Sequence, residues 1–294
     1  MYKLVVVDNP LAASFYEVFT FPVLRSKLYM TQREGPIVAV GANSNQKPIG
    51  LAMAEIVPNN QSNILSIFVD ASHRNQGIGT ALLEYLLKEL KLRNCQSAQI
   101  IYVTGKPTTI ALERILAKNN WTSPKPRMLV CNCDRQMLKA PWLQKEYPLA
   151  TEFTIFPWTE LTEQDRLRLN DRFKNETWIP ELLNPLAHDN NFEPLNSIGL
   201  RYRDEVVGWI ITHRLSPTTI RYTCSYIRPN LQRLGRILAL YSESIKRQAA
   251  NPDIFEAIWT VPFIYSSMID FVKRRMANYM ISIKESRESL KIIN

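Results

Sequence analysis

Short apolar runs alternate with stretches of helical periodicity along the first half of the chain. Runs rich in β-branched and aromatic residues predict strands, and apolar residues spaced three and four apart from Ile78 to Leu90 predict a helix that begins at Gly77. The expected elements, in order, are helical segments within 11–30, strands over 36–42, 48–57 and 64–69, the helix after 77, a strand over 98–103, a helix over 108–120 and a strand over 127–134.

The second half repeats this order at a fixed spacing. Gly50 and Gly208 lie 158 residues apart, as do Gly77 and Gly235, and residues 99–103 correspond to 257–261 at the same spacing. Self-similarity of this kind indicates two copies of one fold. We expect an N-terminal domain over 1–140 and a C-terminal domain over 150–294. Each should be α+β with α/β/α layering, a mixed, mainly antiparallel sheet flanked by helices.

The net charge of +9 lies mostly in the first half. Residues 1–147 carry 17 Lys and Arg against 10 Asp and Glu, whereas the remainder carries 19 against 17. A basic half favours a polyanionic partner such as a nucleotide cofactor, an acidic substrate or nucleic acid, although a solvated basic surface has the same composition.

Cysteine content and hydropathy narrow the class of protein. Four cysteines do not make a disulfide framework and fit a reducing, cytoplasmic location. Cys131 and Cys133 could form a metal pair, but they lie in a strand-like run and the chain has only three histidines, so we expect no metal. No apolar stretch approaches the roughly 20 residues of a membrane span, and the N-terminus lacks the apolar region of a signal peptide.

The turn Arg74-Asn75-Gln76-Gly77-Ile78-Gly79 lies between the strand over 64–69 and a helix. The first N–H groups of a helix have no intrahelical partner and sit at the positive end of its dipole. Glycines here remove the Cβ atoms that would keep a bulky anion away from the backbone. The turn therefore predicts a site for a phosphate or pyrophosphate. Any tight turn into a helix could look similar.

Residues 69–90 resemble the acetyl-CoA-binding segment of the GNAT superfamily of N-acetyltransferases. In that family an Arg/Gln-x-x-Gly-x-Gly/Ala pattern follows a strand, and Arg74, Gly77 and Gly79 fill its defining positions. The resemblance covers residues 1–135 well and, through the repeat, 150–285 more loosely. The dinucleotide fingerprint differs, since it is G-x-G-x-x-G. The resemblance implies a tandem GNAT protein.

The resemblance also implies where acetyl-CoA, a co-substrate that needs no metal, is held. The pantetheine arm would pair with a central strand, and the pyrophosphate with the turn and the start of the helix. Basic side chains such as Arg74 and Lys106 would complement the phosphates, and the start of the later helix would contact the pantetheine. The expected cofactor-binding residues are Ile67, Phe68, Val69, Arg74, Asn75, Gln76, Gly77, Ile78, Gly79, Thr80 and Thr109.

The catalytic residues are less clear in the pattern. Many family members have a tyrosine acid where this chain has Leu116, which questions a tyrosine-acid mechanism. Because an ammonium acceptor must lose a proton, Glu55 is the candidate base, with Tyr102 as the alternative. Glu55 could instead be a polar residue on the solvent face of a strand, and Tyr102 could be a core or edge tyrosine.

The C-terminal copy is expected to be degenerate. It keeps Gly235 but has Ile237 where the N-terminal copy has Gly79, and a branched side chain would crowd a pyrophosphate. Arg233 and Arg236 could still attract an anion, so partial function remains an alternative.

The predicted activity is transfer of an acetyl or other acyl group from acetyl-CoA to a primary amine of a small molecule. Alternatives are a protein N-acetyltransferase and a non-catalytic acyl-CoA-binding sensor or scaffold. An aminoacyl-tRNA-dependent transferase of the tandem kind generally lacks the turn, so a nucleic-acid partner is not expected. A homodimer is possible.

Overall fold

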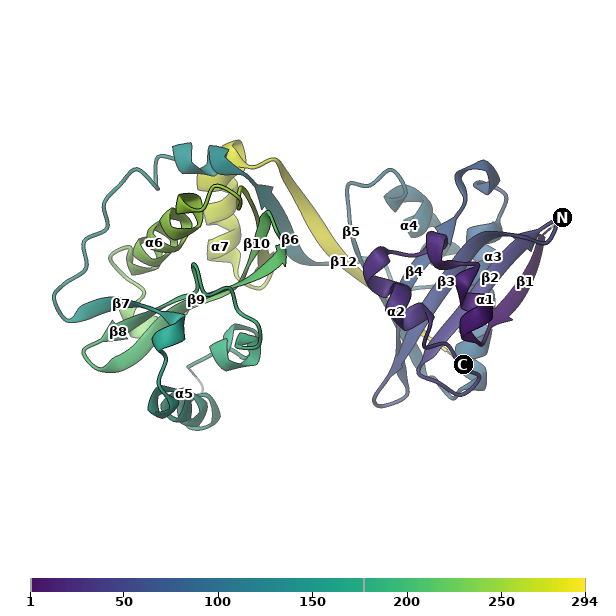
Figure 1. The fold of residues 1–294 in the computed structure, drawn as a ribbon, viewed down its shortest axis with the longest axis horizontal. Coiled ribbons are helices and arrows are strands. Elements are labelled where there is room, and N and C mark those ends of the chain that lie inside the picture. The colour runs from purple at the N-terminus through teal and green to yellow at the C-terminus, as the bar shows by residue number, and fades with distance from the viewer. Residues whose placement is uncertain (1, 177, 294) are drawn as a thin grey trace. The chain divides into compact units, whose positions relative to one another are not determined.

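The computed structural model describes residues 2–176 and 178–293, which form two compact units (Figure 1). Unit 1 consists of Met1–Arg127 with Glu285–Asn294, and unit 2 of Met128–Lys284. These units differ from the expected domains of 1–140 and 150–294 in the last strand of each half. Residues 128–133 pair within unit 2, and residues 286–292 pair within unit 1, because each final strand completes the sheet of the other copy.

The sheet of unit 1 has the spatial order β1-β2-β3-β4-β5-β12. Neighbouring strands are antiparallel, except for the parallel pair β4 and β5. The sheet is therefore mixed and mainly antiparallel, as expected. Its strands are β1 (Tyr2–Val7), β2 (Ile37–Ser44), β3 (Lys47–Val57), β4 (Gln61–Val69), β5 (Ser97–Val103) and β12 (Ser282–Ile292).

Two separate hydrophobic clusters lie in unit 1. One contains Leu82, Leu83, Leu86 and Leu90 of α3 (Ile78–Leu92), which form the apolar stripe predicted for this helix, together with Leu116 of α4 (Thr109–Lys118). The other includes residues of the short helices α1 (Pro10–Ser14) and α2 (Arg25–Leu28). Segment 11–30 is more broken than expected, with 3-10 turns at Glu17–Phe19 and Pro22–Leu24.

Unit 2 repeats this architecture with the strand order β6-β11-β10-β9-β8-β7. Its strands are β6 (Lys125–Cys133), β7 (Phe153–Pro157), β8 (Ile198–Tyr202), β9 (Glu205–Ser216), β10 (Thr219–Ile227) and β11 (Glu256–Pro262). Its helices are α5 (Glu163–Asn175), α6 (Arg236–Ala250) and α7 (Ser266–Phe271), the last continued by a π-helical turn over Val272–Met276.

The repeat spacing of 158 residues holds as far as the start of α6 and then changes. Gly77 and Gly235 are both left-handed N-cap residues, with φ of 79° and 70°. Gln61 pairs with Ser97 in unit 1, however, and Thr219 pairs with Glu256 in unit 2. The correspondence of 99–103 with 257–261 was therefore wrong by one residue, because one extra residue lies between α6 and β11.

The helices in residues 2–176 and 178–293 are all too short or too polar to span a bilayer. All four cysteines are buried and unbridged. Within the same residues, His, Cys, Asp and Glu side chains do not gather in groups of three or more that could bind a metal ion.

Candidate functional site

A gap opens in the sheet of unit 1 between β4 and β5. The two strands pair only from Gln61 and Ser97 to Ile64 and Ile100, and the described residues contain no further pair between them. Beyond this point β4 still pairs with β3, and β5 still pairs with β12. Each edge of the gap is therefore held from its outer side, while its inner backbone groups are left for another partner.

A β-bulge at Leu65 lies where the gap begins. Met53 pairs with Ser66 and Ala54 with Ile64, so Leu65 is the extra residue on β4. A bulge bends its strand and increases the local twist. This accounts for the divergence of β4 from β5 immediately after Ile64.

A cavity of about 670 Å³ lies at this gap and reaches both faces of the sheet. Its lining includes Ile67, Val69 and Tyr102, which pack with the cluster that contains α3. It also includes Leu65, which packs with the α1–α2 cluster, and Ser66, whose hydroxyl lies 3.2 Å from that of Thr20. A cavity of this volume suits a small molecule or a cofactor.

One end of the cavity is the start of α3. Gly77 is its N-cap residue, and no side chain in the described structure caps this helix start. A Cβ added to Gly77 would meet nothing within 4 Å, so the space over the turn is open. A Cβ on Gly79 would lie 3.1 Å from Cδ1 of Ile115, because the helix starts close against α4. The uncapped N–H groups can bind an anion.

The charges of the lining suit an anionic ligand. Among the described residues, the side chains that line the cavity include no carboxylate, and the cationic or ionisable nitrogen groups are His73, Arg74, Lys106, Arg114 and Lys118. Arg74 is fixed by a hydrogen bond of 3.0 Å from its Nε to the carbonyl oxygen of Val69. Several cations without an intervening carboxylate attract a polyphosphate.

Most of the expected cofactor-binding residues lie on this cavity. They are Ile67, Val69, Arg74, Asn75, Gly77, Ile78, Gly79, Thr80 and Thr109. Phe68 and Gln76 are not among the lining residues. The Phe68 ring lies beside the Phe19 ring instead, with 5.8 Å between centroids, because alternate residues of a strand face opposite sides.

Sequence reasoning missed several lining residues. His73 contributes to the cavity wall but is not among the expected site residues. Arg114 and Lys118 lie four residues apart on α4, a spacing that could have indicated a basic helix face. Phe21 comes from a distant turn, and no local pattern marked it.

The two candidate catalytic residues are placed differently. Tyr102 lines the cavity, and its hydroxyl donates a hydrogen bond of 2.8 Å to Glu113 Oε1. Burial and this carboxylate raise the pKa of Tyr102, which disfavours the phenolate that a base would require. Glu55 is not among the lining residues, and its carboxylate accepts hydrogen bonds of 2.6 and 2.7 Å from Lys27 Nζ.

Unit 2 retains the diverging strands but not the open turn. Thr223 is the extra residue on β10, at the position that corresponds to Leu65. A Cβ on Gly235 would lie 3.1 Å from the ring of Tyr147, whose hydroxyl is fixed by a 2.6 Å hydrogen bond to the Trp142 carbonyl oxygen. The position over the glycine that is open in unit 1 is therefore covered by the chain itself in unit 2.

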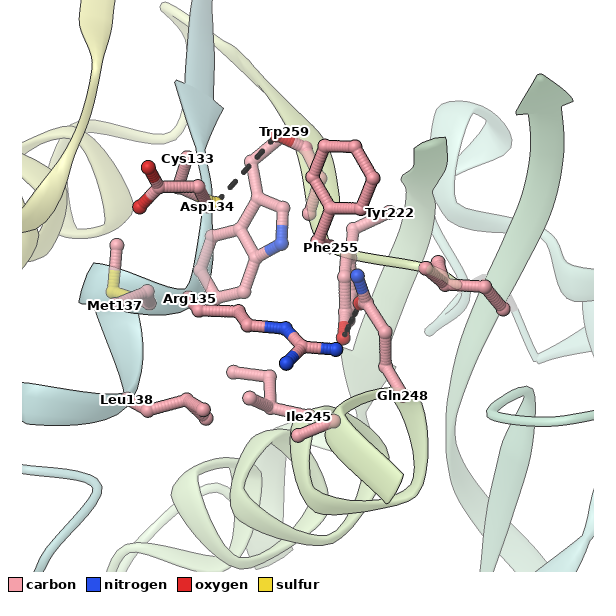
Figure 2. Close-up of a pocket in the computed structure, with 13 residues that line it drawn as sticks. Cys133, Asp134, Arg135, Met137, Leu138, Tyr222, Ile245, Gln248, Phe255 and Trp259 are labelled. Carbon is pink, nitrogen blue, oxygen red and sulfur yellow. Dashed lines mark hydrogen bonds between the residues drawn. The ribbon is translucent and has the colours of Figure 1, made fainter. Parts of the chain in front are cut away.

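A much smaller cavity lies in unit 2, at the paired end of β10 and β11 (Figure 2). Its volume is about 30 Å³, enough for a water molecule but not for a nucleotide. Tyr222 and Gln248 line it and are joined by a 3.0 Å hydrogen bond. This cavity has no counterpart to the open helix start of unit 1.

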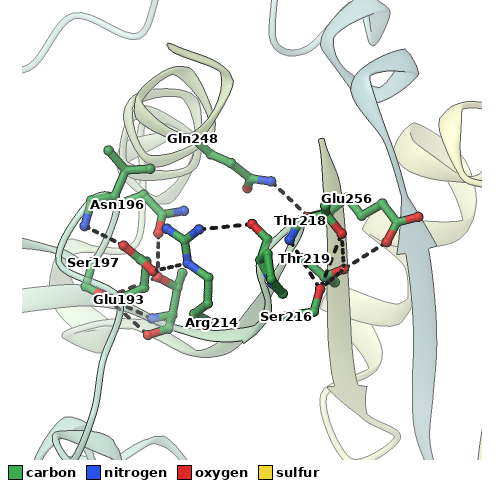
Figure 3. A network of polar contacts seen from close by, with 12 residues as sticks. Glu193, Asn196, Ser197, Arg214, Ser216, Thr218, Thr219, Gln248 and Glu256 are labelled. Carbon is green, nitrogen blue, oxygen red and sulfur yellow. Dashed lines mark hydrogen bonds and ion pairs between the residues drawn. The ribbon is translucent and has the colours of Figure 1, made fainter. Parts of the chain in front are cut away.

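Polar side chains in unit 2 satisfy one another (Figure 3). The buried carboxylate of Glu193 accepts a 2.6 Å hydrogen bond from Arg214 Nε. Asn196 accepts one of 2.6 Å from the Thr212 hydroxyl, and Gln248 donates one of 3.1 Å to the carbonyl oxygen of Glu256. Such a network stabilises a fold when its members are paired.

Comparison with known proteins gives the same architecture. Residues 4–112 match the sequence model of the acetyltransferase (GNAT) family. The fold is similar to that of a tandem GNAT protein from the clavulanic acid biosynthesis pathway, with 10% sequence identity and a TM-score of 0.68. The match covers 100% of this chain and 99% of that protein. A GCN5-related N-acetyltransferase from Sphaerobacter thermophilus is similar over 100% of this chain and 96% of its own, with 12% identity and a TM-score of 0.59. None of the curated proteins compared matches the chain in sequence.

Within unit 1, residues 4–112 are therefore similar in sequence to the acetyltransferase (GNAT) family. The chain as a whole has the fold of a tandem GNAT protein.

Proposed function

We propose that unit 1 binds acetyl-CoA in the cavity between β4 and β5 and transfers its acetyl group to a primary amine of a small molecule. The observation that supports this proposal most is that a gap in the sheet and an open, uncapped helix start line the same cavity of unit 1. Unit 2 has the diverging strands but a covered turn, so we assign it no cofactor.

The lining residues fit the parts of acetyl-CoA in order. The N–H groups from Asn75 to Thr80 would bind the pyrophosphate, which the positive end of α3 also favours. Arg74 and the cations of α4 would balance the phosphate charges. The unpaired inner edges of β4 and β5 would pair with the amides of the pantetheine arm.

The chemistry then requires little from the side chains. The amine nitrogen attacks the thioester carbonyl, a C–N bond forms, the C–S bond breaks, and the CoA thiolate departs. Tyr102 is protonated at neutral pH, and we assign it the role of hydrogen-bond donor to the thiolate, for which its hydroxyl must turn away from Glu113. The proton that the amine releases passes to solvent. We assign Glu55 a structural role, since its carboxylate is paired with Lys27.

Two alternatives keep the same cofactor. A sensor would bind acetyl-CoA without turnover, and a protein N-acetyltransferase would use an exposed peptide amine. We favour a small-molecule acceptor because a cavity of about 670 Å³ has the volume typical of small-molecule sites. We also propose a cytoplasmic location, with which the unbridged cysteines agree.

Calorimetry with acetyl-CoA, followed by a free-thiol assay with a panel of amines, tests these assignments. We expect micromolar binding and amine-dependent release of CoA. Absence of binding would refute the proposed site, whereas binding without release of CoA in the presence of any amine or peptide would favour the sensor.

A further inference from the structure

The cavity has one face that the cofactor assignment does not use. Leu65 and Ser66 face the α1–α2 side of the sheet, where Leu65 packs with that cluster and Ser66 meets Thr20. Strand alternation places Ile101 on the face opposite Ile100 and Tyr102, which pack with the α3 cluster. Phe21 joins this face from the turn before α2. An acceptor can approach the thioester here while acetyl-CoA occupies the α3 side.

The side chains of this face are apolar and accessible. Phe21 is 52% exposed and Ile101 is 45% exposed, although both line a cavity. Large apolar side chains left accessible in a concave site are typical of a surface that binds an apolar ligand. The hydroxyl pair of Ser66 and Thr20 is the polar feature beside them.

No carboxylate of the described residues lines the cavity at this face. Carboxylates of nearby segments have partners, including Glu17, which precedes Phe21 in the chain and accepts a hydrogen bond from the Tyr29 hydroxyl. Glu113 accepts hydrogen bonds from Tyr102 and Arg287, and Asp70 accepts them from Ser72. Lys106 Nζ lies 5.4 Å from the centroid of the Phe21 ring and adds positive charge. A second ammonium on the acceptor would be repelled.

We propose that the acceptor is a monoamine carried on an aromatic or similarly apolar body, and that it binds as the neutral amine with its apolar part against Phe21, Leu65 and Ile101. This inference rests on the proposed function, because it names the acceptor for the same site.

Binding of the neutral amine has a kinetic consequence. The ionisable side chains that face the cavity are His73, Arg74, Tyr102, Lys106, Arg114 and Lys118. His73 belongs to the turn that leads to α3, and its Nδ1 lies 3.3 Å from Asp70 and 2.8 Å from Ser72. Because no carboxylate faces the amine, its own deprotonation should limit kcat/KM at low pH.

The test compares matched amines on the full chain. We expect 2-phenylethylamine to have at least a tenfold higher kcat/KM than its analogue with a second aminomethyl group on the ring, and than spermidine. A side-chain-fluorinated phenylethylamine, whose amine is less basic, should move the midpoint of the pH profile down by the difference between the two amine pKa values. A midpoint independent of the amine would overturn neutral binding, and a preference for the diamine or for spermidine would overturn the apolar acceptor.

Variants connect the preference to this face. Phe21→Ala should raise the KM for phenylethylamine at least tenfold and leave the KM for acetyl-CoA unchanged. Phe15→Ala is the matched control, since Phe15 is 63% exposed on the same segment and is not a lining residue. Phe21→Glu should reduce the discrimination against the diamine. If Phe21→Ala instead changed the KM for acyl-CoA with chain length, the face would hold an acyl chain and the inference would fail.

Acetyl-CoA binding, measured by calorimetry beside each assay, separates the two proposals. Absence of binding would remove the proposed function and this inference together. Binding with no turnover of phenylalkylamines would overturn the acceptor class alone.

Discussion

A charge placed at Gly77 tests the difference between the two turns. The perturbation is Gly77→Glu, with Gly77→Gln as a control of nearly the same shape, and the same pair of substitutions at Gly235. Both glycines have left-handed φ values, 79° and 70°, so either substitution should cost about 1–2 kcal/mol of folding free energy. At Gly77 the backbone is the source of strain, because an added Cβ meets nothing within 4 Å.

The difference between Glu and Gln isolates the electrostatic contribution to acetyl-CoA binding. For a carboxylate about 5 Å from one phosphate charge, repulsion is about 0.8 kcal/mol at a dielectric constant of 80 and about 3 kcal/mol at 20. Because about 1.4 kcal/mol corresponds to a factor of ten, Gly77→Glu should bind acetyl-CoA from about 4-fold to about 200-fold more weakly than Gly77→Gln.

Calorimetry at two salt concentrations provides the measurement. Exposed charges are screened over about 10 Å at 0.1 M salt and about 3 Å at 1 M, so the excess loss in Gly77→Glu should shrink at high salt. The substitutions at Gly235, where Tyr147 covers the turn, should leave acetyl-CoA affinity unchanged. Equal affinities for Gly77→Glu and Gly77→Gln, or a loss at Gly235 as large as that at Gly77, would refute the assignment of the anion site to unit 1.

Three further changes test other parts of the molecule. Removing residues 285–294 deletes the strand paired with β5 and should abolish acetyl-CoA binding. Added peptide 282–294 should restore part of the binding. Normal binding of acetyl-CoA by the truncated chain would contradict a role for β12 in the site. Tyr102→Phe should lower kcat several-fold and leave the KM for acetyl-CoA unchanged; an unchanged kcat would exclude Tyr102 as donor to the thiolate. Hydrogen bonding to Arg201 lowers the pKa of Asp165 to about 2 from 3.8. The ionised carboxylate should therefore contribute about 2 kcal/mol to the free energy of unfolding above pH 4, and this contribution is lost as the pH falls through about 2. Urea unfolding of Asp165→Asn should therefore show a deficit at pH 6 that disappears near pH 2, and a constant deficit would contradict the linkage.

The local parts of the fold could be predicted from the sequence. The stripe of leucines in α3 and the glycine turn before it depend on residues close together in the chain, where periodicity and backbone freedom decide the structure. The exchange of β6 and β12 could not be predicted, because both strands have the pattern of a final sheet strand and nothing local selects which copy they join.

In the candidate site, too, local features could be predicted from the sequence and tertiary contacts could not. The turn from Arg74 to Gly79 could be found because its chemistry lies in the backbone and in adjacent residues. The place of Phe21 in the cavity wall depends on tertiary contacts, so sequence reasoning omitted this residue. The pairing of Glu55 with Lys27 also depends on them, and without it Glu55 was proposed as a base. The shift of one residue before β11 was also hidden, since an insertion in a loop leaves the strand pattern intact.

The strand exchange sets the order in which the protein can mature during synthesis. β5 acquires β12 only when residues 286–292 exist, although every other strand of unit 1 has been made by residue 103. At about 5–20 residues per second, translation leaves the wall of the gap unpaired on that side for on the order of ten seconds or more. Unit 2, whose turn is covered, must therefore be translated before unit 1 can complete its sheet. The proposed cofactor site of unit 1 is complete only after β12 has been made.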